Sequence, residues 1–230
     1  MTTDRNTSQA PGTWRTRAGI YGFAAVAALG FGATLATISA PVTVEARMEA
    51  QVPDPCDFAT SGGFVVNPLT GKKANFGVHG GCKNGAFWGH LNFVDHANGY
   101  HVNSVEVTAY LAPNGVEAPV RDVCGIAQTN NPADPEFVYF RARLIDNGEP
   151  GGADQFGLLL GPEGGPATYQ VPPAGTLDQY GMPAFVLTLG TARPGGNVQL
   201  HSPNPSTVVL PGVDEAAACG GLTFNANPPE

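Results

Sequence analysis

The 230-residue sequence contains 31 glycines and 21 prolines and has a formal net charge of −8 at pH 7. Breakers this frequent exclude long helices over most of the chain, because proline lacks a backbone donor and glycine is too flexible for a helix interior. After residue 50, seven Lys and Arg stand against sixteen Asp and Glu, and Lys72-Lys73 is the only adjacent basic pair. An acidic surface repels phosphate backbones, so this composition argues against a nucleic-acid partner.

Residues 1–50 have the order of an export signal. Arg15 and Arg17 precede an uncharged apolar run over 18–41 that is rich in small residues. A positive end followed by an apolar segment predicts a signal peptide. The run is also long enough to cross a bilayer as a helix at about 1.5 Å per residue, so an uncleaved membrane anchor is the alternative. The chain is therefore expected to be secreted or displayed at the cell surface, or else held by this N-terminal helix.

The remainder predicts one all-β domain over 51–224 and a flexible tail over 225–230. Short runs of alternating apolar and polar residues are typical of strands with one buried face. About ten such strands, separated by turn residues, predict an antiparallel β-sandwich or flattened barrel, preceded by an N-terminal signal or anchor helix. The clearest alternation covers 86–94, 102–111, 137–146 and 197–201. Weaker runs cover 63–66, 74–78, 120–127, 155–160, 184–189, 207–210 and 222–224, and 161–181 is expected to be a long excursion from the sheet.

The alternation also predicts which side chains face the core. The inner positions are Phe87, Leu91, Phe93, Val105, Val107, Ala109, Val138, Phe140, Ala142 and Leu144. The outward positions carry three aromatic residues, Trp88, Tyr110 and Tyr139. Exposed aromatic side chains on a sheet form stacking platforms for sugars or protein partners, so these three are a candidate ligand face. The alternative is that a second layer, or the excursion over 161–181, covers them.

Four cysteines follow the leader: Cys56, Cys82, Cys124 and Cys219. An even number in an exported protein predicts disulfides, and the absence of a C-x-x-C pair argues against a zinc site. Three pairings are possible. The pairing Cys82–Cys124 with Cys56–Cys219 is favoured, because the second bridge would tie together the two ends of the domain.

Four blocks of sequence carry a resemblance to a known family. They are CDFATSGGFV at 56–65, GKKANFGVHGGCKNGAFWGHLNFVDH at 71–96, DNGEPGGADQFGLLL at 146–160 and GGNVQLH at 195–201. Together and in this order they resemble post-COAP domains, small secreted bacterial modules, some of which follow a choice-of-anchor domain. The resemblance implies a secreted or surface location and brings no established activity or site residues. The leader here runs almost directly into Cys56, without a choice-of-anchor domain before it, so a role tied to that neighbour does not carry over.

Two sets of residues are candidate metal ligands. The loop over 146–154 gathers Asp146, Asn147, Glu149 and Asp154, and hard oxygen ligands of this kind suit calcium. The pattern does not match an EF-hand, and the alternative is that Asn-Gly and Pro-Gly form turns that the acids cap. His90 and His201 form a zinc or copper site if the fold brings their strands together. No cofactor is required by the sequence, and calcium is the one that it suggests.

No catalytic residue is assigned, because the chain has neither a G-x-S-x-G elbow nor an H-E-x-x-H motif. The sequence therefore predicts a non-catalytic secreted or surface module in envelope-associated binding or adhesion, with a cell-surface glycan or protein as partner. The alternative is a small extracellular hydrolase stabilised by calcium. A binding module presents a shallow face with aromatic side chains, whereas a hydrolase needs a cleft with converging carboxylates or histidines.

Overall fold

The computed structural model describes residues 50–68, 70–172, 176–177, 183–184, 187–189, 195–203 and 212–223. The predicted leader up to residue 49, the strand expected at 207–210 and the tail at 225–230 lie outside them. Within these ranges the chain is almost entirely antiparallel β-structure, which confirms the all-β, antiparallel part of the predicted fold class. The elements are β1 (Phe58–Val66), β2 (Lys73–Lys83), β3 (Ala86–Asp95), β4 (Tyr100–Leu111), β5 (Val120–Thr129), β6 (Val138–Ile145), β7 (Gln155–Gly161), β8 (Tyr169–Val171), β9 (Thr176–Leu177), β10 (Pro183–Ala184), β11 (Leu187–Thr188), β12 (Gly196–His201) and α1 (Glu215–Ala218).

One sheet accounts for most of these strands. Its order is β11-β7-β6-β5-β4-β3-β2-β1-β12, so neighbours in sequence pair from β1 to β7 and the late strand β12 returns to the edge of β1. β8, which lies within the excursion predicted at 161–181, pairs with the same edge of β7 as β11 does. β9 and β10 form a separate two-stranded sheet. The run predicted at 184–189 is divided between β10 and β11.

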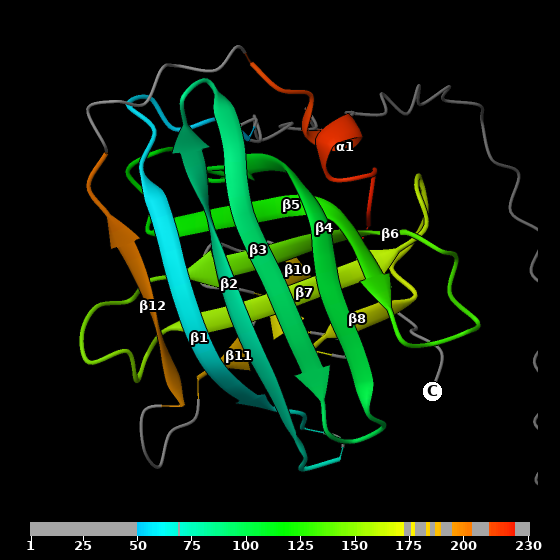
Figure 1. Ribbon diagram of the computed structural model, residues 1–230. Coiled ribbons are helices and arrows are strands. Elements are labelled where there is room, and N and C mark those ends of the chain that lie inside the picture. Colours follow the sequence, from blue (N-terminus) through cyan, green and yellow to red (C-terminus); the bar gives the residue numbers. More distant parts are fainter. Residues whose placement is uncertain are drawn as a thin grey trace, which may run out of the picture. The chain divides into compact units, whose positions relative to one another are not determined.

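The large sheet curls until its two halves face each other. Figure 1 shows β12, β1, β2 and β3 in front, crossing over β5, β6 and β7 behind. The rings of Phe76 on β2 and Phe156 on β7 stack with their centres 4.0 Å apart, although four strands separate them in the sheet. We call β12, β1, β2, β3 and the start of β4 layer 1, and the end of β4 with β5, β6, β7, β8 and β11 layer 2. The main core lies between the layers.

β4 passes from one layer to the other through two irregularities. Its register against β5 shifts between Ser104 and Glu106 and again between Val107 and Ala109. Each extra residue reverses the faces of the alternating side chains. The prediction that Val105 faces the core and Tyr110 faces outward is therefore wrong, because Val105 is 58% exposed and Tyr110 is fully buried.

The other clear strands keep their predicted faces. Leu91 and Phe93 of β3 are buried in the main core, and Phe87 packs against it. In β6 the buried inner residues are Val138, Phe140, Ala142 and Leu144. Strict alternation without a bulge explains why these strands could be predicted.

A buried ion pair closes one end of the space between the layers. Arg121 on β5 donates to both carboxylate oxygens of Asp57, and the Tyr110 hydroxyl donates to Asp57 Oδ1 at 2.8 Å. Burial alone would lower the pKa of Arg121, but Asp57 outweighs it, so the pKa lies above its ordinary value. Burial raises the pKa of Tyr110, and the charge of Asp57 adds to the rise. Arg121 therefore stays charged and Tyr110 stays neutral near neutral pH.

The two disulfides are Cys56–Cys82 and Cys124–Cys219, so the favoured pairing is wrong. The register of β1 against β2 places Phe58 opposite Gly81, which puts Cys56 next to Cys82 at the same end of the pair. Cys124 points away from the main core of layer 2, where the C-terminal segment crosses it. There are no free cysteines.

The short helix α1 was not predicted. Asp214 is its N-cap and accepts hydrogen bonds from the backbone N–H groups of Ala216 and Ala217. The Thr108 hydroxyl of β4 donates to the carbonyl of Ala218, which fixes the helix against the sheet (Figure 1). In the described part of the chain no helix has the length and hydropathy needed to cross a membrane.

Candidate functional site

The outer face of layer 1 is almost uncharged. It combines amides, imidazoles, aromatic rings and bare glycines. Its residues are Asn197, Gln199, His201, Phe58, Thr60, Gly62, Phe64, Val66, Lys73, Asn75, Gly77, His79, Gly81, Trp88, His90, Asn92, Val94, His101, Asn103 and Val105. Lys73 is the one ionised side chain in this set, and its ammonium lies 3.9 Å from the centre of the Phe64 ring.

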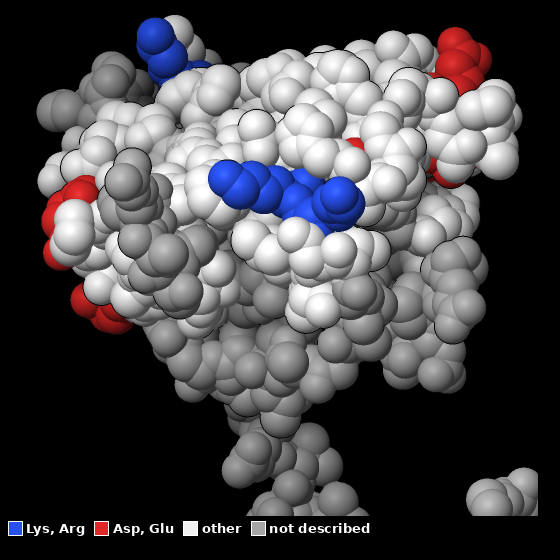
Figure 2. All heavy atoms as spheres, turned by 90° about the horizontal axis from the view of Figure 1, so that it is seen from below, with Lys and Arg blue, Asp and Glu red and all other residues white. Residues whose placement is uncertain are grey.

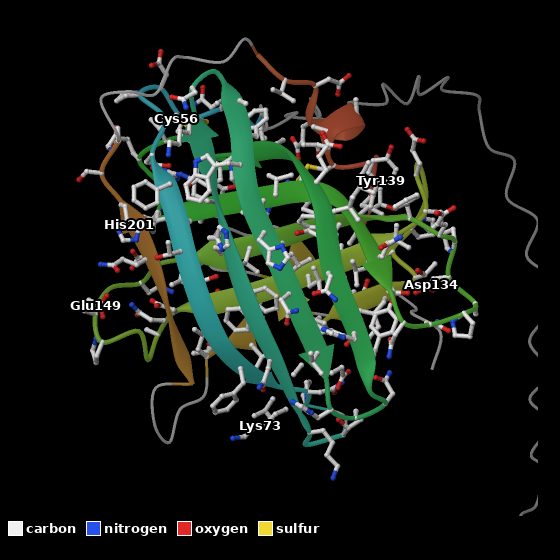
Figure 3. The ribbon with its side chains drawn as sticks, viewed as in Figure 1. Cys56, Lys73, Asp134, Tyr139, Glu149 and His201 are labelled. Atoms are coloured by element: carbon white, nitrogen blue, oxygen red, sulfur yellow. A yellow bond between two sulfur atoms is a disulfide. The ribbon has the colours of Figure 1, made fainter. Side chains whose placement is uncertain are left out.

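Lys72 and Lys73 lie at one end of the molecule, and Lys83 lies at the other end of β2. Lys73 begins β2, next to Lys72 in the connection from β1. Figure 2 looks at this end and shows a band of basic atoms at its centre and a second basic group at one corner, with most of the acidic atoms near the margins. Figure 3 views the outer face of layer 1 itself, with His201 at one side and Lys73 at the lower end. The centre of the face therefore offers hydrogen-bonding groups and aromatic rings rather than charge.

Three rings line the end of this face nearest Cys56. His201 on β12 stacks on Phe58 of β1 with ring centres 4.3 Å apart. Phe58 in turn lies 6.0 Å from Trp88 of β3, across the glycine that pairs with both. All three side chains are half-buried, so their rings support one another and leave part of their surface open. Trp88 thus lies on an outer face, as predicted.

An imidazole pair follows Trp88 along the face. His79 of β2 is the register partner of His90 of β3, and their ring centres are 6.1 Å apart. The Nδ1 atom of His90 lies 2.9 Å from the Ser104 hydroxyl of β4. Partial burial lowers the pKa of His79, and the neighbouring His90 lowers it further. His79 is therefore a neutral imidazole at neutral pH.

Amide groups extend the same face toward β4. The Asn92 side-chain nitrogen donates to Asn103 Oδ1 at 2.6 Å and lies 3.3 Å from His101 Nε2. These bonds hold the planes of the side chains in fixed positions. Fixed amides and imidazoles present directed donors and acceptors, which suits hydroxyl groups on a ligand.

The local backbone does not require glycine at two positions in the centre of the face. Gly62 and Gly77 are register partners inside β1 and β2, and Asn92 of β3 pairs with Gly77. We call such a set of register partners across neighbouring strands a row. A Cβ atom added at Gly77 would meet nothing within 4 Å, and at Gly62 only the Phe76 carbonyl at 3.8 Å. Neither residue has the positive φ angle that favours glycine. A glycine inside a strand weakens it and often marks a close approach by a ligand or another backbone.

The predicted calcium loop uses its carboxylates on backbone N–H groups. Asp154 accepts from Asn147 N at 2.8 Å and from Val198 N at 2.7 Å. Asp146 accepts from Gly148 N and Leu200 N, each at 2.9 Å. Val198 and Leu200 present these N–H groups on the edge of β12 that does not face β1. The loop therefore caps the open edge of the sheet.

The other two members of this candidate site are also engaged. The Asn147 side chain donates to the carbonyl of Ala153, and Glu149 accepts from the Asn197 side chain at 3.0 Å. The backbone carbonyl of Asp154 accepts from Leu189 N, next to β11. Asp154 therefore connects β11 and β12, which are the two edge strands of the sheet. Burial raises the pKa of Asp154, and its two backbone donors offset this rise only in part.

His90 and His201 are not brought to one point. His90 shares a row with His79, Thr60 and Gln199, and three strand spacings of about 4.8 Å separate β3 from β12. Their separation of roughly 14 Å is too large for a shared ion. His201 Nε2 lies 2.8 Å from the Thr60 hydroxyl instead. Over the described ranges no group of three or more His, Cys, Asp or Glu side chains is arranged to hold a metal ion.

Two of the three predicted ligand aromatics lie elsewhere. Tyr110 is buried between the layers, as described above. Tyr139 of β6 packs with Leu159, Ala167 and Leu222 on the outer side of layer 2, beneath the C-terminal segment. The excursion and the C-terminal segment thus cover Tyr139, which is the alternative given by the sequence.

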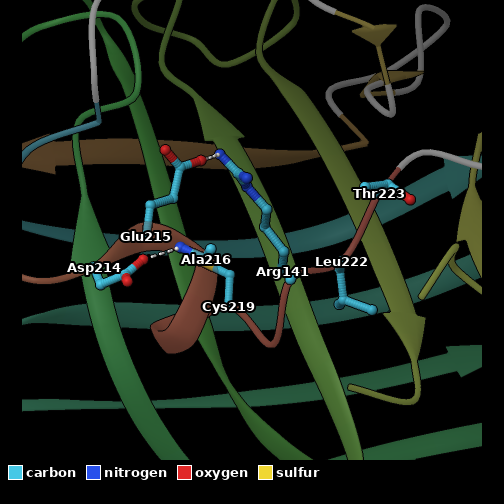
Figure 4. A pocket seen from close by; sticks show the side chains of 8 residues that line it. Arg141, Asp214, Glu215, Ala216, Cys219, Leu222 and Thr223 are labelled. Carbon is cyan, nitrogen blue, oxygen red and sulfur yellow. Dashed lines mark hydrogen bonds and ion pairs between the residues drawn. The ribbon is translucent and has the colours of Figure 1, made fainter. Parts of the chain in front are cut away.

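A small pocket lies beside α1 on layer 2. It has a volume of about 350 Å³ and is lined by Arg141, Asp214, Glu215, Ala216, Cys219, Gly221, Leu222 and Thr223. Figure 4 shows Arg141 reaching Glu215 across it. The Arg141 guanidinium also pairs with the fully buried Asp122, which Arg143 contacts from the other side. The polar groups of this pocket therefore hold the C-terminal segment on β6.

The sequence identified Trp88 and His90 but not the residues that surround them. The run expected at 74–78 stops one residue before His79, although its inward Phe76 and Val78 place His79 outward. Phe58 and Thr60 precede the predicted start of β1. The pairing of these strands with β12 is not a local property of the sequence. No protein-family model, curated protein or solved structure matches this chain.

Proposed function

We propose that this chain is an exported, non-catalytic binding module that holds an uncharged glycan on the outer face of layer 1. The observation that carries the proposal is the chemistry of that face. Trp88 and fixed amides and imidazoles surround a strip of backbone without side chains, which Gly62 and Gly77 form and which we call the bare strip. Sugars offer apolar ring faces for stacking and hydroxyl groups for hydrogen bonds. The centre of the face carries no charged side chain, because Lys73 lies at one end and the carboxylates Glu149, which accepts from Asn197, and Glu106, next to Val105, lie at its margins. An uncharged centre favours a neutral sugar over an acidic one.

The bare strip supports the same conclusion. Gly62 and Gly77 leave the strands without side chains between Asn197 and Asn92, so a flat ring has room to lie against the backbone. The two disulfides support export, because such bridges persist in oxidising compartments. The order of the four sequence blocks supports a module of the post-COAP type. Cleavage or retention of the leader decides between a secreted and an anchored form.

The test is binding of the fluorescently labelled full chain to an array of neutral and acidic oligosaccharides. We expect binding to neutral glycans, and Trp88→Ala should lower the affinity about tenfold or more, as loss of a central aromatic contact does. Phe137→Ala is the matched control, because Phe137 is 46% exposed and lies outside this face. Gly77→Gln should also weaken binding while the fold is retained, because its side chain would enter the open strip. Binding restricted to acidic glycans, or equal binding by wild type and Trp88→Ala, would contradict the proposal.

A further inference from the structure

We propose that His79 and His90 together bind one divalent transition-metal ion, with Cu²⁺ held most tightly. The inference rests on the geometry of this pair and does not depend on glycan binding. Neutral imidazole is a ligand for copper, zinc and nickel, and affinity at a given nitrogen site peaks at Cu²⁺ in the divalent series. Two protein ligands leave the other positions on the ion to water or to an external donor.

The ring separation fits a shared ion. A metal–nitrogen distance of about 2.0 Å places the ion about 3 Å from each ring centre, so two rings on one ion have centres about 4.5–6.4 Å apart, according to the angle at the metal. The 6.1 Å between the His79 and His90 rings falls inside this range. The final torsion of a histidine side chain is broad, so the rings can turn toward the ion without leaving their rotamers.

The neighbouring strand orients His90. Ser104 on β4 holds Nδ1, and β2 with His79 lies on the opposite side of β3. With Nδ1 held by β4, Nε2 is the ring nitrogen of His90 that we assign to the metal. A partner that fixes one ring nitrogen while the other binds metal is the usual outer-shell arrangement of metal-binding histidines.

Competing positive charges do not oppose binding at this pair. The row that contains the pair continues into Thr60 and Gln199, which carry no charge, and the chain as a whole is acidic. A cation is thus attracted by the long-range field and meets no fixed positive charge in its own row.

The test is titration of the full chain, purified without a histidine tag, with Cu²⁺, followed by calorimetry and electron paramagnetic resonance. We expect one tight Cu²⁺ per chain and hyperfine splitting from two imidazole nitrogens. His79→Gln and His90→Gln should each lower the affinity at least tenfold and leave one nitrogen. His101→Gln, a histidine on the same face held by amides, should change neither.

Several outcomes would overturn the site. They are no stoichiometric binding by the wild type, unchanged affinity in both variants of the pair, or an equal loss in His101→Gln. Because His90 is exposed, His90→Gln decides the matter even if His79→Gln disturbs the fold. If glycan binding fails but Cu²⁺ binds, this inference stands and only the proposed function is refuted. If glycan binds but Cu²⁺ does not, only this inference is refuted.

Discussion

Replacing Asp154 by Asn should destabilise the domain by about 2–3 kcal/mol. The fully buried carboxylate accepts two backbone hydrogen bonds, from Asn147 and Val198. An amide keeps one acceptor and turns an N–H₂ group toward the other backbone donor, which then lies unpaired. A hydrogen bond to a charged group contributes about 1.5–3 kcal/mol, and a buried unpaired donor costs a similar amount. Asp146→Asn is the matched control and should cost about 0.5–1.5 kcal/mol, because Asp146 is only half-buried and water can replace the lost acceptor.

Urea denaturation at pH 7 measures both variants. A lower midpoint with an unchanged m-value reports a loss of native stability. The double variant Asp146→Ala/Asp154→Ala should also self-associate more than the wild type in sedimentation experiments, because the N–H groups of Val198 and Leu200 then offer an open strand edge. A midpoint for Asp154→Asn equal to that of wild type, or a larger loss for Asp146→Asn, would refute the capping argument.

Replacing Cys124 and Cys219 by alanine should lower the free energy of unfolding by about 4.7 kcal/mol, from the chain entropy of the 95-residue loop that the bridge closes. The same change at Cys56 and Cys82 should lower it by about 3.5 kcal/mol, because that bridge closes a loop of 26 residues. Guanidinium denaturation midpoints measure both losses. Burial alone would raise the pKa of Asp122, but Arg141 and Arg143 outweigh this effect and lower the pKa. The Asp122 carboxylate therefore stabilises the fold above about pH 4, and this stabilisation is lost as the pH falls through the lowered pKa. Asp122→Asn should therefore cost about 3–5 kcal/mol at pH 7 and flatten the acid limb of a melting-temperature profile. Gly77→Ala should raise the free energy of unfolding by up to about 1 kcal/mol, because its Cβ would meet no neighbour. Gly125→Ala should lower it, because its Cβ would lie 2.6 Å from the Phe140 ring. Thermal melts of the two variants distinguish these outcomes.

Local alternation was sufficient to predict a strand only where the strand is regular. β6 alternates strictly and has the predicted inner face. β4 has two register shifts, and the outward prediction for Tyr110, which follows both of them, failed. A bulge adds one residue to a strand and leaves no distinct mark in the hydrophobic pattern. The faces of a strand that moves between layers therefore could not be predicted from its sequence alone.

Pairings between distant segments were the other limit. The disulfides follow from strand register, since Cys56 lies beside Cys82 because β1 pairs with β2. The return of β12 to β1 explains why Asp146 and Asp154 serve as edge caps, because their partners are N–H groups about fifty residues further along the chain. The residue types in this loop allow either calcium binding or capping. The N–H groups that the loop caps belong to a second strand, whose position no local pattern in the sequence shows.

Folding requirements separate the residues of layer 1, and of the loop that caps its edge, into two groups. The blocks around Cys56, 146–154 and 196–201 are explained by a bridge, an edge cap and an edge strand, so their chemistry is already used by the structure. Gly62, Gly77 and the outward ring of His79 meet no comparable requirement, and the two glycines weaken the strands that contain them. Residues that lower stability and lie together on one face are expected at a functional site, because folding alone does not explain why those residue types are present. The search for a ligand should therefore begin at the row that joins Gly62, Gly77 and Asn92, and at the imidazole pair beside it.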